Sequence, residues 1–362
     1  MKKICWLLLP ALCFMQVTHA QDVSLRDKEI IHLNTLLQND TSVQRLYAPL
    51  KATSIAALEQ SAAPIDTIHT EGRLQGDPQK VATQAALKDM NKMYALALQY
   101  RLTSDSRYKD KAIEYLLAWA AHNKANGDPI DDTNLDPAVE AYDLIKKEIP
   151  AAQKATIDAW LQATAQEEIR RATAGHPLNN NNWHSHRIKE VGEIGFAIDN
   201  KTFQQYAIDG IRLQVATNLK ADGSSIDFES RDALHYQLYD LEPLLKLAVI
   251  LQRATGKDYY RYKDNDRSIA RSVAWTVPFV TGEKTHAEYL HSTVEFDRKR
   301  AANKEAAFKI GADFVPQTGL LMITLAQYFQ PDLRSVRAHL QPDNNAFIEW
   351  INVLNMLRVP KS

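Results

Sequence analysis

The sequence predicts an all-α protein, folded as an (α/α) toroid or incomplete barrel of antiparallel helix pairs. Apolar residues recur at three- and four-residue steps over most of the chain, which is the period of an α-helix. Glycine is scarce, at 12 of 362 residues, and runs with the two-residue period of a strand are almost absent. Short connections rich in glycine, proline and asparagine favour stacked antiparallel pairs. Because no repeat of fixed length is present, periodicity alone leaves an α-solenoid open.

Two stretches show the helical period most clearly. In Val81–Tyr100, the side chains of Leu87, Met90 and Ala97 fall on one side, and Tyr108–Ala121 has the same pattern. Further helices are expected at Pro137–Lys147, Ala151–Ala172, His184–Ile198, Thr202–Leu219, Asp232–Thr255, Ile269–Trp275, Ala301–Ile310, Thr318–Phe329 and Asn345–Leu357.

Residues 1–20 have the pattern of a secretory signal peptide. A basic start at Met1–Lys3 precedes the apolar stretch Ile4–Met15, and Thr18–Ala20 offers small residues at a cleavage site. The stretch is too short and wrongly flanked for a membrane span. Its two lysines and short apolar stretch are typical of a bacterium, so we expect export to the periplasm. The mature chain, residues 21–362, is expected to form a single domain.

The mature chain is expected to hold together by core packing alone. The only cysteines, Cys5 and Cys13, lie in the signal peptide, so neither a disulfide nor a thiolate site remains. Leu12 before Cys13 argues against a lipoprotein anchor. The formal charge is −1 for the full chain, and losing Lys2 and Lys3 makes it more negative. Nucleic acid or a membrane surface would favour a basic excess, so we expect neither, and a polyanionic sugar would need a local basic lining.

A first polar segment, residues 178–187, has the sequence Leu-Asn-Asn-Asn-Asn-Trp-His-Ser-His-Arg. Asn181 or Asn182 is well placed to open the helix that follows, since asparagine is a favoured N-cap. A helix N-terminus attracts carboxylates through its free N–H groups and positive dipole end. Groups for proton transfer and charge pairing follow in the first turn: His184, His186 and Arg187. The same pattern also fits a polar loop with surface histidines.

A second segment follows the turn Asp222–Ser225. If residues 231–245 are helical, Arg231, His235 and Tyr239 fall four residues apart and share one face. Leucines line a neighbouring face, which must be core: Leu234, Leu238, Leu241 and Leu245. A stripe of guanidinium, imidazole and phenol beside the core is either a structural hydrogen-bond network or a site.

Amide, guanidinium, imidazole and phenol groups together suit β-elimination in a uronic acid polymer. The proton on C5 is weakly acidic, and removing it requires the neighbouring carboxylate to be neutralised. A base must reach C5, and an acid must protonate the leaving oxygen O4. In mannuronate and glucuronate these two atoms lie on the same side, so one tyrosine can serve both, whereas guluronate needs a second base. No metal or cofactor is required, and none is expected.

These two segments resemble the helical alginate lyase superfamily, whose (α/α)-barrel members include alginate lyases and glucuronan lyases. The resemblance rests on Asn181-Asn182 opening a helix, and on Asp222-Gly223 followed by the stretch from Arg231 to Leu241. The order of helices is similar from about Val81 onward. The resemblance implies a polysaccharide lyase that acts on an anionic polysaccharide, alginate or glucuronan.

The resemblance also implies roles for individual residues. Asn182 would neutralise the carboxylate, Tyr239 would serve as catalytic acid and base, and Arg231 would support both the tyrosine and the substrate. The arginine lies one residue further from the tyrosine than in the family pattern.

The histidine of the family pattern is absent from its usual position in this chain. It directly follows the asparagine pair in the alginate lyases, whereas Trp183 stands there in this chain. We expect its role to pass to His186, with His184 close behind and His235 as a further alternative. The resulting Asn-Trp-His-Ser-His-Arg pattern is closer to glucuronan-active and broad-specificity members, which shifts the expected substrate away from strict polymannuronate.

Six further residues are expected to contact the sugar chain: Asn181, Trp183, Arg187, Tyr236, Tyr289 and Arg298. The last two belong to a stretch, residues 286–300, that fits a solvated charge run equally well. We expect the protein to be a monomer or weak dimer.

Other functions remain open on sequence grounds. A helical glycoside hydrolase would need a carboxylate pair, and the candidates are Asp131, Asp132, Asp136 and Glu140, with Asp227 and Glu229 as partners. A periplasmic sugar-binding protein would have strands, which the pattern lacks. A solenoid adaptor would not need the stripe of Arg231, His235 and Tyr239.

Overall fold

The computed structural model describes residues 22–173, 180–340 and 346–358. The expected signal peptide and the first two residues of the polar segment 178–187 lie outside these ranges. Within them every regular element is a helix, so the all-α prediction is confirmed. No helix in the described ranges is both long enough and apolar enough to cross a membrane.

The helices of the N-terminal half are α1 (Asp27–Asn39), α2 (Thr41–Leu58), α3 (Pro78–Ala86), α4 (Lys88–Thr103), α5 (Ser106–His122), α6 (Pro129–Asp132), η1 (Thr133–Leu135), α7 (Asp136–Ile145) and α8 (Ala151–Thr173). Those of the C-terminal half are α9 (Asn182–Ala197), α10 (Lys201–Thr217), α11 (Ile226–Arg231), α12 (Leu234–Thr255), α13 (Ile269–Val280), α14 (Glu295–Ala302), η2 (Ala306–Phe308), η3 (Pro316–Gly319), α15 (Leu320–Ala326), α16 (Leu333–His339) and α17 (Ala346–Arg358).

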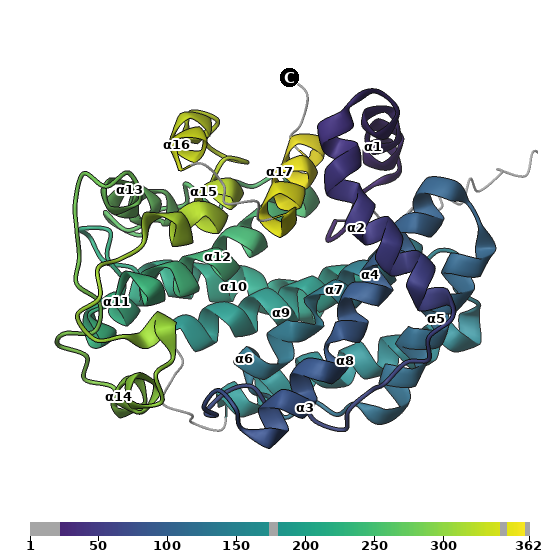
Figure 1. The fold of residues 1–362 in the computed structure, drawn as a ribbon, viewed down its shortest axis with the longest axis horizontal. Helices are drawn as coiled ribbons and strands as arrows, with labels where there is room; N and C mark the ends of the chain where they lie inside the picture. The colour runs from purple at the N-terminus through teal and green to yellow at the C-terminus, as the bar shows by residue number, and fades with distance from the viewer. Residues whose placement is uncertain (1–21, 174–179, 341–345, 359–362) are drawn as a thin grey trace, which may run out of the picture.

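Among the described residues, contacts between seven helices close an inner ring of the (α/α) toroid. Figure 1 shows α12, α9, α7 and α4 across the middle of the molecule, with α17 next to α2 above them. In order around the ring, α2 packs on α4, α4 on α7, α7 on α9, α9 on α12, α12 on α15, α15 on α17, and α17 returns to α2. A second set packs against this ring: α1 on α2, α5 on α4, α8 on α5 and α9, α10 on α9, α13 on α12, and α16 on α15. The alternation of inner and second-layer helices is the antiparallel pairing that the sequence predicts.

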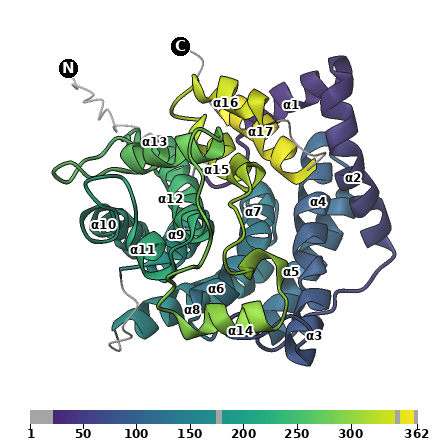
Figure 2. The ribbon, with the colours of Figure 1, turned by 60° about the vertical axis from the view of Figure 1, so that its left-hand side comes forward.

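One segment bridges the two halves of the chain. Figure 2 shows α14 extended between the region of α11 and that of α3. Just after α14, the side chain of Asn303 donates to the carbonyl of Gln75 at 3.1 Å, and Glu305 accepts from the backbone N–H of Gln75 at 2.8 Å. These two hydrogen bonds tie the loop before α3 to the C-terminal half of the chain.

Several predicted helix bounds were wrong. The stretch Val81–Tyr100 contains two helices that meet at Leu87, and the helix predicted at Ala301–Ile310 is instead α14, which ends at Ala302. The first turn of α14 carries acidic side chains, which favour a helix start. The prediction also missed α1 and α2.

Glycines allow α9 to approach its neighbours closely. A Cβ added to Gly210 in α10 would lie 2.3 Å from Cγ2 of Ile188 in α9. A Cβ added to Gly192 in α9 would lie 2.8 Å from Cδ1 of Leu247 in α12. All of α9 except Trp183 is buried, so the path of this helix is fixed on every side.

We expect Gly210→Ala to lower the free energy of unfolding, because the added methyl group overlaps Ile188 and forces the two helices apart. Overpacking costs about 1 to 3 kcal/mol, which exceeds the gain in helix propensity of at most about 1 kcal/mol. Urea unfolding measures the difference. Gln205→Ala, at an exposed position of the same helix, is the control, and a Gly210→Ala variant as stable as that control would contradict the close packing.

Candidate active site

A polar cavity of about 430 Å³ is lined by the first turns of α9 and α12. Other parts of its wall come from the loop before α3, from η1, from α11, and from α14 and the turn after it. The lining residues are Thr70, Glu71, Lys80, Ile130, Thr133, Asn134, Asn182, Trp183, His186, Arg231, His235, Tyr236, Tyr239, Arg300, Glu305 and Phe308. Three of these side chains are cationic and two are carboxylates, so the cavity has the local basic excess that a polyanionic sugar would need.

The N-terminus of α9 presents Asn182 to the cavity. The predicted asparagine cap is confirmed at Asn181, whose side chain accepts a hydrogen bond from the backbone N–H of Trp183 at 3.1 Å. One carboxylate oxygen of Asp227 accepts from the backbone N–H of Asn182 at 2.7 Å, and the other accepts from its side-chain amide. Asp227 therefore fixes both the backbone and the side chain of Asn182.

A buried polar network supports Asp227 from behind. The amide of Asn218 lies 3.4 Å from Asp227 and 2.7 Å from Asp240, which also accepts from Ser185 at 2.6 Å. The amide of Gln214 donates to Ser185 at 2.5 Å. Burial raises the pKa of Asp227 to about 6, although the bonds from Asn182 act in the opposite direction. Burial and the charge of Asp227 raise the pKa of Asp240 well above its usual range.

The predicted single helix through Arg231, His235 and Tyr239 was wrong. Helix α11 ends at Arg231, Asp232 takes a left-handed conformation with φ 48°, and α12 begins two residues later. The carboxylate of Glu288 caps the new helix by accepting from its first two backbone N–H groups at 2.9 and 3.1 Å. Arg231, His235 and Tyr239 still line one cavity, because the break turns α11 back toward the start of α12.

Arg231 is held from two sides. Its guanidinium lies 2.6 Å from the buried carboxylate of Asp297 and 3.8 Å from the ring centroid of Tyr236. An ion pair and a cation–π contact together leave the guanidinium little freedom. The cation is therefore a fixed charge in the cavity wall.

A second arginine in the cavity was missed. Arg300 donates to the hydroxyl of Tyr236 at 2.8 Å and lies 3.6 Å from Glu71. The residue predicted from the same stretch, Arg298, is exposed, contacts the carbonyl of Ser292 at 3.2 Å, and does not line the cavity. The prediction of Arg298 was wrong because the two arginines are two residues apart on the helix α14 and therefore point to different sides of it.

Tyr239 and His235 lie side by side on α12. Their rings are nearly parallel, with an interplanar angle of 10° and centroids 6.3 Å apart. Burial, and then the nearby Glu71 and Tyr236, raise the pKa of Tyr239 well above its usual value. Burial, and then the charge of Arg300, lower the pKa of His235 to about 4. At neutral pH the cavity therefore holds a protonated phenol beside a neutral imidazole.

His186 faces the same cavity from α9. Its ring centroid lies 4.5 Å from that of Tyr239, and its Nδ1 lies 3.3 Å from the hydroxyl of Thr133. Burial, and then the charge of Lys189, lower the pKa of His186 to about 3. In the described part of the chain its Nε2 is buried and has no hydrogen-bond partner.

His184 and Arg187 lie away from the cavity, which corrects two predictions. His184 is two residues from His186 and so points to the other side of the helix, where its ring packs edge-on against Tyr206 at 6.4 Å. Arg187 is 1% exposed and pairs with the buried Glu168 at 3.0 Å. Both are core residues of α9, and neither is available to a substrate.

Two more of the expected sugar contacts lie behind the cavity wall. The side chain of Asn181 is used for capping, and Asn181 does not line the cavity. Tyr289 is 2% exposed, has a left-handed backbone with φ 65°, and packs edge-on against Tyr236 at 6.3 Å. The other two expected contacts, Trp183 and Tyr236, do line it.

Nine lining residues were not predicted: Thr70, Glu71, Lys80, Ile130, Thr133, Asn134, Arg300, Glu305 and Phe308. They come from loops and short helices that no motif marks. Arg300 lay in the stretch 286–300 that the sequence had singled out, and Ile130, Thr133 and Asn134 lie beside the carboxylates that were considered for a hydrolase. The folding of distant loops onto the ends of α9 and α12 is what brings the others to the cavity.

The carboxylates suggested for a hydrolase lie elsewhere. None of the six lines the cavity: Asp131, Asp132, Asp136, Glu140, Asp227 and Glu229. Asp131, for example, accepts hydrogen bonds from Thr70 and Asn126 at 2.7 and 3.0 Å. Lys246 lies 3.0 Å from Asp136. These carboxylates serve structural pairing, and the hydrolase alternative loses its candidate pair.

An acidic cluster, in which two of the three carboxylates are buried, lies between the start of α7 and the middle of α9. Oxygens of Asp136, Glu190 and Glu193 come within 4.8 Å of one another, as metal ligands would. Two ammonium groups, however, already lie among these carboxylates: Lys189 contacts Asp136 and Glu190, and Lys246 lies 3.0 Å from Asp136 and Glu193. The three carboxylates are already paired with lysine ammonium groups, so we assign no metal ion to this cluster.

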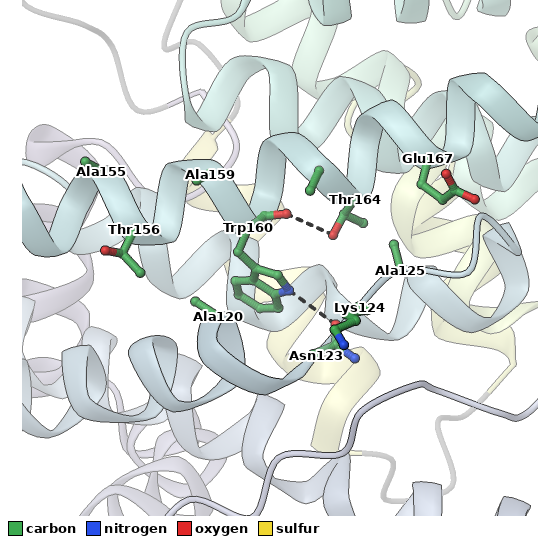
Figure 3. Close-up of a pocket in the computed structure, with 11 residues that line it drawn as sticks. Ala120, Asn123, Lys124, Ala125, Ala155, Thr156, Ala159, Trp160, Thr164 and Glu167 are labelled. Carbon is green, nitrogen blue, oxygen red and sulfur yellow. Dashed lines mark hydrogen bonds between the residues drawn. The ribbon is translucent and has the colours of Figure 1, made fainter.

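A larger cavity, of about 730 Å³, lies between α5 and α8 (Figure 3). Alanines form much of its wall, and the indole N–H of Trp160 is bonded to the side chain of Asn123 at 3.2 Å. Its ionisable side chains among the described residues are Lys124 and Glu167, and Glu167 is paired with Arg170 at 2.5 Å. Its size therefore does not make it the catalytic site.

The toroid of helix pairs and its basic cavity with amide, imidazole and phenol groups are those of a polysaccharide lyase. Residues 34–286 match the family model for alginate lyase, and the chain therefore belongs to the alginate lyase family. No curated protein matches the sequence closely enough to count as a relative.

Solved structures of alginate lyases share the fold. An alginate lyase from Bacteroides ovatus is 15% identical with a TM-score of 0.68, over 93% of this chain and 98% of that one. Alginate lyase A1-III from Sphingomonas species A1 is 18% identical with a TM-score of 0.63, over 96% of this chain and 98% of that one. A variant of A1-III complexed with tetrasaccharide is 19% identical with a TM-score of 0.57, over 73% of this chain and 79% of that one.

We expect activity on alginate to rise with pH through about 6, because Asp227 must be ionised to accept both hydrogen bonds from Asn182. Below its pKa the protonated carboxyl loses an acceptor and Asn182 is released. Asp227→Asn, which has one acceptor oxygen, should lower kcat about 10- to 100-fold through misplacement and remove the step near pH 6. The measurement is kcat against pH.

Glu229→Gln is the control for this prediction, since Glu229 lies on the same helix but is exposed. Its pH profile should match that of the unmodified protein. An Asp227→Asn variant that keeps the step at the same pH would show that another group causes it.

Proposed function

We propose that the protein cleaves 4-O-linked uronic acid polymers, alginate or glucuronan, by β-elimination. The observation that carries the proposal is the fixed amide of Asn182 in one cavity with the phenol of Tyr239 and the imidazole of His235. These groups supply carboxylate neutralisation, an acid and a base, which are the three requirements of the reaction.

Neutralisation of the substrate carboxylate falls to Asn182 and the cations. The amide of Asn182 has two N–H groups and gives one to Asp227, which leaves the other for a ligand. Arg231 and Arg300 contribute fixed positive charge to the wall without being free to move. A preformed arrangement of this kind stabilises an enolate-like intermediate, because no reorganisation is needed as charge develops.

Proton transfer falls to Tyr239 and His235. The high pKa of Tyr239 keeps its phenol protonated, which suits the acid that protonates O4. His235 is half-buried, neutral above about pH 4, and its ring makes no hydrogen bond within the described residues, which suits the base that removes the C5 proton. This differs from the sequence-based preference for His186, whose Nε2 is buried.

The positions of the acid and base favour particular polymers. His235 and Tyr239 both extend from α12 with nearly parallel rings, so they approach a bound sugar from the same side. Removal of the C5 proton and protonation of O4 on one side suit mannuronate and glucuronate, in which the two atoms lie on the same side. Polyguluronate is the poorer substrate on this account.

Further parts of the proposal rest on sequence. The pattern of residues 1–20 supports export to the periplasm, where a uronic acid polymer would be degraded. The protein acts there as a monomer or weak dimer, without nucleic acid or a membrane as partner. The tetrasaccharide complex of an A1-III variant supports a saccharide as the ligand of this fold.

Mass spectrometry of the products tests the reaction type. Each cut by a lyase yields an end that lacks one water, with a double bond between C4 and C5, whereas each cut by a hydrolase adds one water. We expect the unsaturated ends from alginate or glucuronan. Saturated products from both polymers would overturn the proposal in favour of hydrolysis.

We expect Tyr239→Phe to fold normally and to lower kcat by about 100-fold or more, because it removes the proton donor. His235→Gln should lower kcat to a similar extent by removing the base. Steady-state rates of double-bond formation measure both. Tyr289→Phe is the matched control, since this phenol lies behind the wall and its hydroxyl has no partner in the described residues. Substantial activity in Tyr239→Phe would remove Tyr239 from the mechanism.

A further inference from the structure

A second cavity, of about 570 Å³, adjoins the basic cavity at the start of α12. His235 and Tyr239 line both cavities, so the two proposed proton-transfer groups lie on the boundary between them. The helix η2 follows the same boundary, since Ala307 lines the second cavity and Phe308 lines the basic one. Most of the remaining wall of the second cavity comes from η3, from α15 and from the start of α17.

The second cavity differs from the basic cavity in charge. None of its described lining residues is a lysine or an arginine, whereas three such residues line the basic cavity. Its carboxylate, Glu242, is half-buried and makes no ion pair or hydrogen bond with another described residue. Burial raises the pKa of Glu242 to about 8, so this group is largely uncharged at neutral pH. A sugar carboxylate buried in this cavity would therefore meet no cation.

The wall is instead apolar, and it presents an aromatic ring. Leu238 and Leu320 contribute buried apolar side chains, and Phe347, in the first turn of α17, lines the cavity while 65% exposed. The C–H groups on the face of a sugar ring pack on an aromatic ring whatever charge the sugar carries. Gln317 and Thr318 are exposed lining residues that can bond sugar hydroxyls. Such a wall suits a sugar that is held by its ring and hydroxyls.

The chemistry of elimination assigns an occupant to each cavity. The base takes the C5 proton of a uronate, the electron pair of that C–H bond forms the C4–C5 double bond, and the bond from C4 to O4 breaks. The acid protonates O4, which leaves as the C1 hydroxyl of the preceding sugar. O4 therefore joins the two sugars where Tyr239 acts, and Tyr239 lies between the cavities. With the uronate beside Asn182 in the basic cavity, the preceding sugar lies in the second one.

We propose that the second cavity binds the sugar on the O4 side of the cleaved uronate by stacking on Phe347, without contact to a carboxylate, so that this sugar can be neutral. Only the uronate in the basic cavity needs its carboxylate, because only that sugar loses a proton from C5. The substrate class then includes polymers in which a uronate follows a neutral sugar, besides alginate and glucuronan. This inference rests on the proposed function. Most of the second cavity's wall lies beyond residue 286, where the match to the family model ends, so membership of the family does not assign it.

Two tetrasaccharides that differ in one sugar test the proposal. Both contain 4-O-linked units, with the uronate whose polymer the protein cleaves at the second position and glucose at the third and fourth. The first unit, at the non-reducing end, is the same uronate in one and glucose in the other. Each tetrasaccharide has a single uronate with a sugar on O4, and therefore a single cleavable bond.

We expect the two values of kcat/KM, measured by double-bond formation, to agree within about tenfold. A larger preference for the tetrasaccharide with a uronate at the first position would overturn the inference while leaving the proposed function intact. If no uronic acid polymer yields a double bond, the proposed function itself fails, so the two failures can be told apart.

Substitution of Phe347 tests the stacking contact. Phe347→Ala should raise KM about tenfold for both tetrasaccharides and change kcat less, because the ring binds a sugar and transfers no proton. Phe347→Tyr keeps an aromatic ring and should restore KM. Met356→Ala is the control, since Met356 is exposed on the same helix and lines neither cavity. Thermal unfolding of each variant checks folding. An unchanged KM in Phe347→Ala, or a rise for the uronate-terminated tetrasaccharide alone, would overturn the proposal.

Discussion

The two hydrogen bonds between Asp227 and Asn182 are the contacts on which the rest of the site depends. The carboxylate holds the backbone of Asn182 at 2.7 Å and also holds its amide, at the point where α9 begins. Since every residue of α9 except Trp183 is buried, the helix has little room to shift when a contact is lost. The polar network through Asn218 and Asp240 in turn fixes Asp227. The scaffold thus supplies an amide that is oriented before a substrate arrives, which is how preorganised sites lower the cost of charge development.

Burial then determines what each remaining group can do. The low pKa values of His186 and His235 keep both imidazoles neutral, and the high pKa of Tyr239 keeps its phenol protonated. Positive charge comes instead from Arg231 and Arg300, which ion pairs and aromatic contacts hold in the wall. This combination suits a polyanionic substrate. The fixed arginines attract the sugar polymer, and burial sets the pKa values of the groups that transfer protons.

Local signals predicted the fold class and part of the site. The helical period and the asparagine cap depend on neighbouring residues, and so the all-α fold and the cap at Asn181 could be predicted. The break after Arg231 could not, because the carboxylate that caps α12 comes from Glu288, far along the chain. The choice of Arg298 over Arg300 failed for a related reason: the bounds of α14 decide which arginine faces the cavity. The single domain and the periplasmic location stay predictions.

The most direct measurement is ultraviolet absorbance of the C4–C5 double bond, recorded separately on polymannuronate, glucuronan and polyguluronate. The central claim is that a fixed amide neutralises the carboxylate while His235 and Tyr239 act from one side of the sugar. It predicts that absorbance rises on polymannuronate, glucuronan or both, with little or no rise on polyguluronate. A rise chiefly on polyguluronate would contradict the one-sided arrangement, and no rise on any of the three would contradict the elimination itself.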